Sequence, residues 1–233
     1  MSIDLILAGC GNMGYAMLAG WVKAGRIPAA RVAVVEPNES LRTRAQVLGV
    51  SVYADAAEIP AACQPKLVIF AVKPQVMKDV VPAYKRFVEA GAAALSIAAG
   101  TPIAVFEDLL GSSASVIRCM PNTPAAIGKG MLVLFSNAHV SEEQDTFVRD
   151  LLSANGAVAT IQNEDLMDAV TAVSGSGPAY IFHFIEALTA AAEAAGLPSD
   201  VAKLLAMQTV YGAGALAADS EEEPGKLREN VTS

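Results

Sequence analysis

The sequence predicts an α/β protein in which a doubly wound, mainly parallel sheet is followed by an all-helical domain. Three observations carry this prediction. Strand-like and helical segments alternate over roughly the first 160 residues. A glycine-rich G-x-G-x-x-G loop joins the first of these strands to the first helix. From Glu164 onwards the sequence contains helical runs and no convincing strand. We therefore expect a domain boundary near Gln162, with domains at residues 1–162 and 163–233.

Short apolar runs mark the expected strands of the first domain. Residues 3–8 and 31–35 are two such runs, and the helical pattern at 12–24 completes a β-α-β unit of about 35 residues. Residues 66–72 lack polar alternation, which is typical of a strand buried on both faces of a parallel sheet. Further strands are expected at 93–98, 115–120 and 131–135, the first two each preceded by a helical segment.

Two alanine-rich helical patterns, at residues 179–195 and 201–218, dominate the second domain. Both are apolar nearly all round, whereas a surface helix of a monomer carries a polar face. A domain of about 70 residues is too small to bury two such helices by itself. We therefore expect them to pack against the same helices of a second copy.

The composition excludes several classes of protein. Hydrophobic residues make up 53% of the 233 residues and charged residues 17%, which excludes an intrinsically disordered chain. The net charge of −8 disfavours a nucleic-acid or anionic-membrane partner, so a small molecule or a second copy is expected. Three cysteines and two histidines, without metal-ligand spacing, predict neither a disulfide framework nor a metal site. We expect a reduced, cytoplasmic setting.

Neither a signal peptide nor a membrane span is expected. The opening residues Met-Ser-Ile-Asp-Leu lack a basic region and lead directly into a strand-like run. The two most apolar stretches are interrupted by polar residues, such as Glu186 and Glu193 in one and Lys203 in the other.

The glycine-rich loop has the context that a dinucleotide site requires, because it follows a strand and opens a helix within a β-α-β unit. Its candidate cofactor-binding residues are Gly9, Gly11, Asn12, Met13 and Gly14. Glycines let the backbone approach a pyrophosphate, and the helix start supplies free N–H groups and a partial positive charge. The first domain is thus expected to be Rossmann-like, the alternative being a tight turn without a ligand. Cys10 is interpreted as a small filler rather than a nucleophile.

Glu36 ends the second expected strand, where an acidic side chain accepts from the 2′-hydroxyl of an NAD ribose and repels a 2′-phosphate. Arg42 and Arg44 follow it and could instead reach a 2′-phosphate, or be solvated helix residues. The choice between NADH and NADPH therefore stays open, with charge alone favouring NADH.

Two turns follow strands at the carboxyl edge of the expected sheet, where open α/β sheets bind ligands. Ala71, Val72, Lys73 and Pro74 form the first turn, and the proline keeps Lys73 out of the α region. The second consists of Ala98, Ala99 and Gly100, small residues that would let a nicotinamide ring lie close to the chain. Either segment could instead be a compact turn that binds no ligand.

Several strings together make the chain resemble the pyrroline-5-carboxylate reductase family. They are the glycine loop, the turn at residues 71–74, Met120-Pro121-Asn122-Thr123-Pro124, Ser174-Gly175-Ser176-Gly177-Pro178-Ala179-Tyr180 and the closing Asn230-Val231-Thr232-Ser233. The resemblance covers the entire chain. It implies reduction of the cyclic imine Δ1-pyrroline-5-carboxylate to L-proline by hydride from NADPH or NADH, the last step of proline biosynthesis. It also implies a homodimer built on the helical domain, or a larger homo-oligomer.

The resemblance assigns sites by position. The glycine loop would hold the pyrophosphate, Glu36, Pro37 and Asn38 would meet the adenosine ribose, and the two turns would flank the nicotinamide. Residues around the substrate, partly across the dimer interface, would be Thr171, Ser174, Gly175, Ser176, Glu221, Val231, Thr232 and Ser233.

The sequence departs from the family pattern at its end. In the family, Val-Thr-Ser continues into a glycine-rich loop whose threonine contacts the imine nitrogen, whereas this sequence stops at Ser233. No catalytic side chain is therefore assigned, and we expect this form to retain cofactor binding better than catalysis. Two alternatives remain. The first is a β-hydroxyacid dehydrogenase, which requires a catalytic lysine early in the helix that follows Pro178, but the first lysine after Pro178 is Lys203. The second is a dinucleotide-binding protein without catalytic activity.

Overall fold

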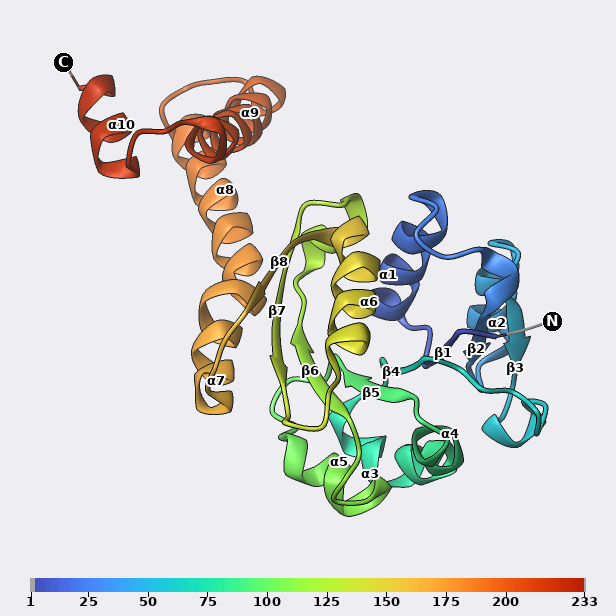
Figure 1. Cartoon of the computed structure of the whole chain (residues 1–233). Coiled ribbons are helices and arrows are strands. Elements are labelled where there is room, and N and C mark those ends of the chain that lie inside the picture. The colour runs from blue at the N-terminus through green and yellow to red at the C-terminus, as the bar shows by residue number, and fades with distance from the viewer. Residues whose placement is uncertain (1–2, 233) are drawn as a thin grey trace. The chain divides into compact units, whose positions relative to one another are not determined.

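The computed structural model describes residues 3–232 and divides into two compact units, Met1–Ser176 and Gly177–Ser233. In the described part of the first unit, eight strands form one sheet in the order β3-β2-β1-β4-β5-β6-β7-β8 (Figure 1). All neighbouring strands are parallel except β6 and β7, which are antiparallel. The strands are β1 (Leu5–Ala8), β2 (Val32–Val35), β3 (Ser51–Tyr53), β4 (Leu67–Phe70), β5 (Ala93–Ser96), β6 (Val116–Met120), β7 (Gly130–Ser136) and β8 (Gly156–Thr160).

Helices cover both faces of this sheet. Leu5 and Leu7 of β1 face the cluster that contains α1 (Asn12–Lys23), α2 (Glu39–Gln46) and α6 (Glu142–Leu152). Ile6 and Ala8 face the opposite cluster, formed with α3 (Met77–Val80), α4 (Lys85–Glu89) and α5 (Ile103–Leu110). Because side chains alternate along a strand, both faces of β1 are apolar and all four of its residues are buried. The predicted doubly wound, mainly parallel sheet is confirmed.

The strand order reverses direction at β1. β2 and β3 continue the sheet on one side of β1, and β4 to β8 continue it on the other. The chain leaves β1 and β4 beside each other, since the Ala71 N–H donates to the Ala8 carbonyl at 2.8 Å. Such a reversal opens a crevice at the carboxyl ends of the strands, and the glycine-rich loop lies there.

The six expected strands are all present, and two further strands were missed. β3 has only three residues, all half-buried at one edge of the sheet, so it lacks an apolar run. β8, with the sequence Gly-Ala-Val-Ala-Thr, lies at the other edge and is rich in small residues that do not distinguish strand from helix. In described residues 164–232 no strand occurs, as expected. The first unit ends with α7 (Met167–Val170) and a π-helix (Thr171–Gly175).

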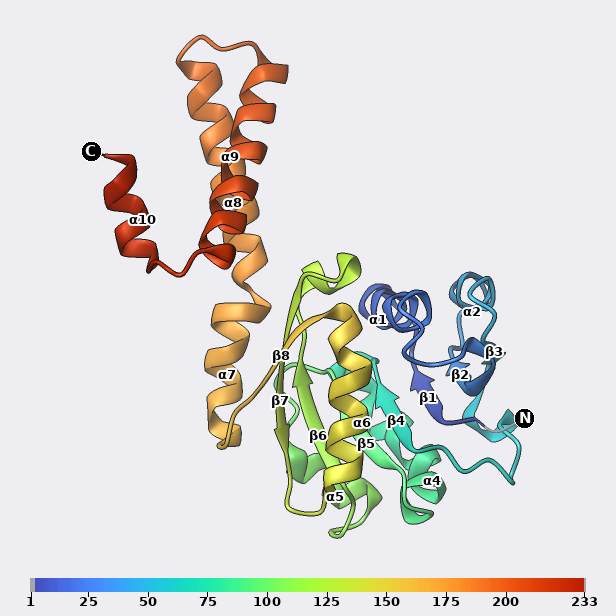
Figure 2. The same cartoon turned by 45° about the horizontal axis from the view of Figure 1, so that its top comes forward.

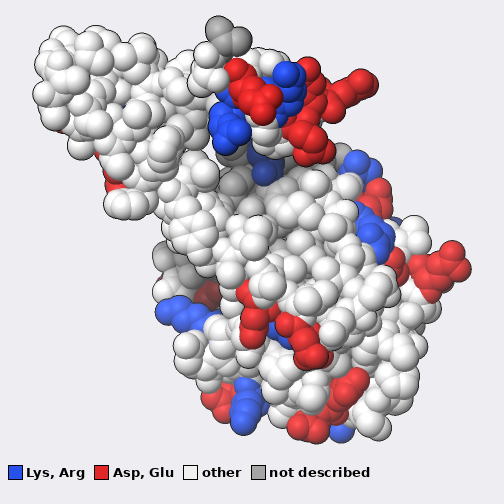
Figure 3. Space-filling model, turned by 90° about the vertical axis from the view of Figure 1, so that its left-hand side faces the viewer, with Lys and Arg blue, Asp and Glu red and all other residues white. Residues whose placement is uncertain are grey.

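The second unit consists of α8 (Gly177–Ala194), α9 (Ser199–Asp219) and α10 (Pro224–Val231). Figure 2 shows α8 and α9 packed along one another as a helical hairpin. Only Ala202 and Ala206 of these three helices are buried. Large apolar side chains of α8 and α9 are exposed instead, including Tyr180, Ile181, Phe182, Phe184, Leu204, Leu205, Met207, Tyr211 and Leu216. In Figure 3 the lobe formed by α8 and α9 shows few charged side chains, whereas charges gather on α10.

Among the described residues, α9 is the one helix long and apolar enough to cross a membrane by length and composition. Lys203 interrupts its apolar sequence, as does Asp200 in its first turn. The same apolar surface suits packing against another protein helix, so length and composition alone do not make α9 a membrane span.

Candidate active site

The glycine-rich loop owes its shape to two of its three glycines. Gly9 has a φ of +89°, and a Cβ there would lie 2.7 Å from Val72 Cγ1 and 2.8 Å from the Ala71 carbonyl oxygen. A Cβ on Gly14 would lie 2.7 Å from the Gly9 carbonyl oxygen. Such distances exclude any side chain, so close packing within the protein requires both glycines.

Gly11 is different, because a Cβ there would meet nothing within 4 Å. It is also the N-cap of α1, and no side chain caps this helix. Packing within the protein therefore gives no reason for a glycine at this position. An anion that approaches the start of α1 does give one, since it would need both the space and the N–H groups.

A cavity of about 540 Å³ lies beside this loop, at the carboxyl ends of β1, β2 and β4. Seven of the predicted cofactor-binding residues line it: Gly9, Gly11, Glu36, Pro37, Ala71, Val72 and Lys73. Sequence reasoning missed the rest of the wall, notably Leu41 of α2, Val76 and the buried Tyr84. No motif marks these three, because each reaches the cavity only through the packing of its own helical turn.

The remaining predicted cofactor residues do not line this cavity. Asn12, Met13 and Gly14 form the first turn of α1, and Asn38 caps α2 by accepting from the Leu41 N–H. Pro74 begins the short helical turn after Lys73, and Ala98, Ala99 and Gly100 follow β5. Their roles in cofactor binding stay predictions.

Glu36 is buried, and each of its two carboxylate oxygens accepts a hydrogen bond from a backbone N–H. Its Oε2 accepts from the Cys10 N–H at 2.8 Å, and its Oε1 accepts from the Asn38 N–H at 3.0 Å. The carboxylate thus joins the glycine-rich loop to the start of α2. Glu36 would make its predicted contact with a ribose in addition to these two hydrogen bonds within the protein.

The two arginines after Glu36 also donate to the backbone. Arg42 Nη1 donates to the Glu36 and Pro37 carbonyl oxygens at 2.8 and 2.5 Å. Arg44 Nη2 donates to the Cys10 carbonyl at 2.9 Å, and the guanidinium lies 4.1 Å from the centre of the Tyr15 ring. Both guanidinium groups therefore support the loops around the cavity, a use that the sequence did not reveal.

Cys10 is fully buried, and this burial raises the pKa of its thiol to about 11, although the Arg44 guanidinium acts in the opposite direction. A thiol with such a pKa carries almost no thiolate at neutral pH. This agrees with the interpretation of Cys10 as a filler.

An ion pair that sequence reasoning missed braces the turn after β5. Arg118 of β6 donates to Glu164 Oε1 at 2.6 Å, and the same oxygen accepts from the Ile103 N–H at 2.8 Å. Ile103 begins α5, directly after the turn that contains Ala98 and Gly100. Glu164 thereby links β6 to the end of the turn that we expect to flank a nicotinamide.

The predicted substrate residues divide between the two units. Thr171, Ser174 and Gly175 form the π-helix at the end of the first unit, together with Ser176, whose N–H donates to the Thr171 carbonyl at 2.8 Å. In the second unit Glu221, Val231 and Thr232 are exposed, and Ser233 lies outside the described residues. Short π-helices are frequent at functional sites, which supports the prediction that the segment from Thr171 to Ser176 binds the substrate.

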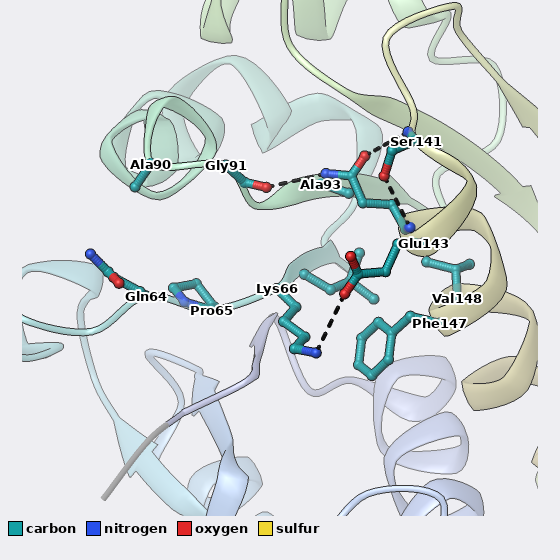
Figure 4. Close-up of a pocket in the computed structure, with 12 residues that line it drawn as sticks. Gln64, Pro65, Lys66, Ala90, Gly91, Ala93, Ser141, Glu143, Phe147 and Val148 are labelled. Carbon is teal, nitrogen blue, oxygen red and sulfur yellow. Dashed lines mark hydrogen bonds and ion pairs between the residues drawn. The ribbon is translucent and has the colours of Figure 1, made fainter.

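A second cavity, of about 360 Å³, lies at the opposite edge of the sheet, where β4 and β5 begin (Figure 4). Four of its polar side chains, those of Lys66, Ser141, Glu143 and Gln144, already have partners within the protein. Lys66 Nζ lies 3.9 Å from Glu143 Oε1, and Gln144 Nε2 donates to the Gly91 carbonyl at 3.1 Å. Ser141 and Gln144 cap α6 reciprocally. None of the predicted site residues lines this cavity, so the carboxyl edge holds the candidate site.

Known proteins resemble this chain over nearly its whole length. Residues 164–233 match the family model for pyrroline-5-carboxylate reductase dimerisation, and residues 3–100 match the model for NADP oxidoreductase, coenzyme F420-dependent. The pyrroline-5-carboxylate reductase of Pseudomonas aeruginosa is 42% identical over 226 residues, which are 97% of this chain and 82% of that protein. The Pisum sativum enzyme of the same name is 36% identical, covering 100% of this chain and 84% of that protein. The chain belongs to the pyrroline-5-carboxylate reductase family.

Solved structures of the family have the same fold. A pyrroline-5-carboxylate reductase from Coxiella burnetii superposes with a TM-score of 0.92 at 32% identity, covering 100% of this chain and 86% of that one. Plasmodium falciparum pyrroline carboxylate reductase with NADP bound gives a TM-score of 0.86 at 29% identity, covering 99% and 84%. The Rossmann-like domain followed by a helical dimerisation domain is thus confirmed. Neither the hydroxyacid-dehydrogenase alternative nor the non-catalytic one is favoured.

Proposed function

We propose that this chain reduces Δ1-pyrroline-5-carboxylate to L-proline by hydride transfer from NADPH or NADH, the last step of proline biosynthesis. The observation that carries the proposal is the 42% identity to a pyrroline-5-carboxylate reductase over nearly the whole chain. A site of the right kind supports it, since a cavity at the strand reversal is lined by a glycine-rich loop with open space at Gly11. We further propose a cytoplasmic location.

The residues around the cavity fit a dinucleotide. The uncapped start of α1 and the bare backbone at Gly11 suit a pyrophosphate, and the apolar wall made by Leu41, Val76 and Val80 suits an adenosine. When bound, a reduced nicotinamide supplies a hydride for the imine carbon. The turns at residues 71–74 and 98–100 would hold the two reacting partners face to face and exclude water.

The substrate side requires little acid or base chemistry from the protein. An imine that arrives protonated already carries the proton that the amine product keeps on nitrogen, so the side chains need only bind and orient it. We propose that Thr171, Ser174, Gly175, Ser176, Glu221, Val231, Thr232 and Ser233 surround the substrate. No side chain of this chain is assigned as a general acid.

We propose that the active form is a homodimer or a larger homo-oligomer built from it, with a functional division between residues 1–162 and 163–233. The match of residues 164–233 to a dimerisation model supports this, as do the exposed apolar side chains of α8 and α9. A second copy would cover these side chains and remove their surface from water.

Oxidation of NADPH and NADH, followed at 340 nm with pyrroline-5-carboxylate, tests the proposal. We expect nucleotide oxidation that requires the imine and yields L-proline in equal amount. Nucleotide binding without turnover, both in this chain and in a chain extended past Ser233, would contradict the proposal and favour a dinucleotide-binding protein without catalysis. Turnover of a hydroxyacid in place of the imine would assign the chain to the other alternative.

A further inference from the structure

The cavity at the carboxyl edge of the sheet reaches from the glycine-rich loop to the end of β3. Because the strand order is β3-β2-β1, its wall meets Gly11 after β1, Glu36 after β2 and Asp55 after β3, in that order. Neighbouring strands lie about 4.8 Å apart, so the wall crosses roughly 10 Å from the first strand to the third. A pyrophosphate at Gly11 and a ribose at Glu36 therefore leave the end near Asp55 for the base of the nucleotide.

Most of the wall at this end is apolar. Alanines flank Asp55 on both sides, and Val76, Val80 and Ala83 come from the helical turns after β4. These side chains offer surfaces on which a planar base can lie, but no hydrogen bonds. The polar residues that line the cavity in the described chain are Glu36, Lys73, Asp55, Asp79 and Tyr84.

Tyr84 brings a hydroxyl from the hydrophobic core into this wall. Its ring meets Phe70 edge-on, with ring centres 5.4 Å apart, and lies 6.4 Å from the Phe87 ring, so packing fixes its orientation. Tyr84 is only 2% exposed yet lines the cavity, and its hydroxyl has no hydrogen-bond partner among the described residues. Unlike Trp21 Nε1, which is enclosed without a partner, this oxygen still touches open space. A ligand in the cavity would supply the partner that a buried tyrosine hydroxyl normally has.

Asp55 holds one carboxylate oxygen in place and leaves the other free. Its Oδ1 accepts from the Ala57 N–H at 2.8 Å and caps the short helix Ala56–Glu58. Its Oδ2 has no partner among the residues that the structure describes. Burial raises the pKa of the Tyr84 phenol, and the nearby charge of Asp55 raises it further. A fixed acceptor and a fixed donor therefore share one end of the cavity.

This pair matches one edge of adenine. The exocyclic amine of adenine donates, and the ring nitrogens on either side of it accept. Guanine and hypoxanthine carry a carbonyl oxygen in place of this amine. That oxygen would face the carboxylate with no proton between the two acceptors, which is unfavourable in a desolvated site.

We propose that Asp55 and Tyr84 select adenine as the base of the dinucleotide, Asp55 by accepting from the exocyclic amine and Tyr84 by donating to a ring nitrogen beside it. The inference rests on the proposed function, which supplies an adenine dinucleotide as ligand. Both residues lie outside the predicted site. They determine which nucleotide binds and take no part in hydride transfer.

The first test compares NADH with reduced nicotinamide hypoxanthine dinucleotide (deamino-NADH), in which a carbonyl oxygen replaces the amine of adenine. We expect the parent chain to bind deamino-NADH at least tenfold more weakly, because a hydrogen bond to a charged group is lost. Calorimetric titration measures both Kd values without turnover. NADPH and its hypoxanthine analogue give the same comparison. Equal affinity for the adenine and hypoxanthine forms would overturn the inference.

Asp55→Asn assigns this preference to one side chain. The asparagine oxygen still accepts from the Ala57 N–H, while the amide nitrogen offers a donor where the free carboxylate oxygen accepted. We expect NADH to bind about tenfold more weakly and deamino-NADH no more weakly than before, so that the preference disappears. An unchanged preference would overturn the inference.

Asp79→Asn is the matched control. Asp79 of α3 lines the same cavity, and its carboxylate has no hydrogen bond within the described chain. The substitution removes the same charge, so both nucleotides should shift alike and the preference should stay within about twofold of the parent value. Loss of the preference in Asp79→Asn but not in Asp55→Asn would assign the base to the wrong carboxylate.

Tyr84→Phe removes only the hydroxyl. We expect NADH to bind about fivefold more weakly, the effect of one neutral hydrogen bond, without a lower melting temperature, because the hydroxyl has no partner in the protein itself. Tyr53→Phe is the control, since Tyr53 packs against the same core but does not line the cavity, and it should leave the Kd unchanged. Full affinity for NADH in Tyr84→Phe would contradict the role of the hydroxyl.

The inference and the proposed function fail in different ways. A chain that prefers NADH to deamino-NADH but oxidises neither with the imine, even when extended past Ser233, would contradict the proposed function and support the inference. A chain that reduces the imine with both nucleotides and binds them equally would do the reverse.

Discussion

The Glu36 carboxylate accepts a hydrogen bond from the backbone N–H of Cys10 at 2.8 Å, across 26 residues of sequence. This bond ties the end of β2 to the glycine-rich loop after β1, and both contribute to the wall of the same cavity. Glu36 therefore shapes the loop that is proposed to receive a pyrophosphate. Its negative charge at the same position disfavours a 2′-phosphate. The two effects can be separated by measuring both nucleotides.

We expect Glu36→Gln to weaken NADH binding about tenfold, because the amide can accept only one of the two backbone N–H bonds and leaves the other donor unpaired. NADPH should be weakened less, because removal of the charge also removes repulsion of the 2′-phosphate. Calorimetric titration with each nucleotide measures the ratio. Glu143→Gln is the control, since Glu143 lies beside Lys66 at the opposite edge of the sheet, and it should change neither Kd. Equal weakening of both nucleotides would show that Glu36 only holds the glycine-rich loop and does not discriminate between NADH and NADPH.

Gly11→Ala should weaken binding of both nucleotides at least tenfold without lowering the melting temperature, because the added methyl group enters open space that a ligand would use. Gly9→Ala should instead destabilise the fold, since φ is positive there and its Cβ meets Val72 and Ala71. Thermal denaturation and nucleotide titration of both variants test this contrast. Full nucleotide affinity in Gly11→Ala would place the pyrophosphate elsewhere.

Arg118→Met should lower the free energy of unfolding by about 3 kcal/mol, because it leaves the Glu164 carboxylate largely buried without its cation. Arg26→Met removes an ion pair with Asp150 that is exposed on both sides, and it should cost about 0.5 kcal/mol. Urea denaturation of the two variants gives the comparison. Similar losses would show that the ion pair between Arg118 and Glu164 contributes no more to the free energy of unfolding than an exposed pair does.

Stability should fall as the pH rises from 9 toward 11. Burial raises the pKa of the Cys10 thiol from 9.0 to about 11, so the unfolded chain releases this proton at a lower pH than the native protein. The stabilisation is complete below pH 9 and is lost as the pH passes through the native pKa. Burial raises the pKa of Cys119 and Tyr84 as well, with the same sign. Urea denaturation at several pH values should show a shallower fall for Cys10→Ala.

The parent chain should have the mass of a dimer or a larger oligomer in solution. Leu204→Glu places a charge among the exposed apolar side chains of α9 and should shift the protein toward the monomer. Val47→Glu is the control, because Val47 is an exposed apolar residue of the first unit, and it should leave the mass unchanged. Light scattering over a range of concentrations measures both. A monomeric parent at high concentration would contradict the dimer.

Local patterns in the sequence were sufficient for the fold class and for seven of the residues that line the candidate cavity. Unbroken apolar runs such as residues 67–70 are buried on both faces wherever they pair, and a glycine loop between a strand and a helix can be recognised without its surroundings. The same holds for the apolar helices of the second unit, whose composition alone predicts a partner. The edge strands β3 and β8 were not predicted, because short, half-buried strands lack an unbroken apolar run.

Only the tertiary structure decided which polar groups meet. Glu36 with Cys10, Arg118 with Glu164 and Asn122 with Ser174 are pairs that lie 26, 46 and 52 residues apart. Each pair depends on strand order and register, and no periodicity in the sequence encodes a partner at such a distance. Hydrogen bonds act over about 3 Å, so the partner of a buried polar group is fixed only once the apolar core has set the backbone in place.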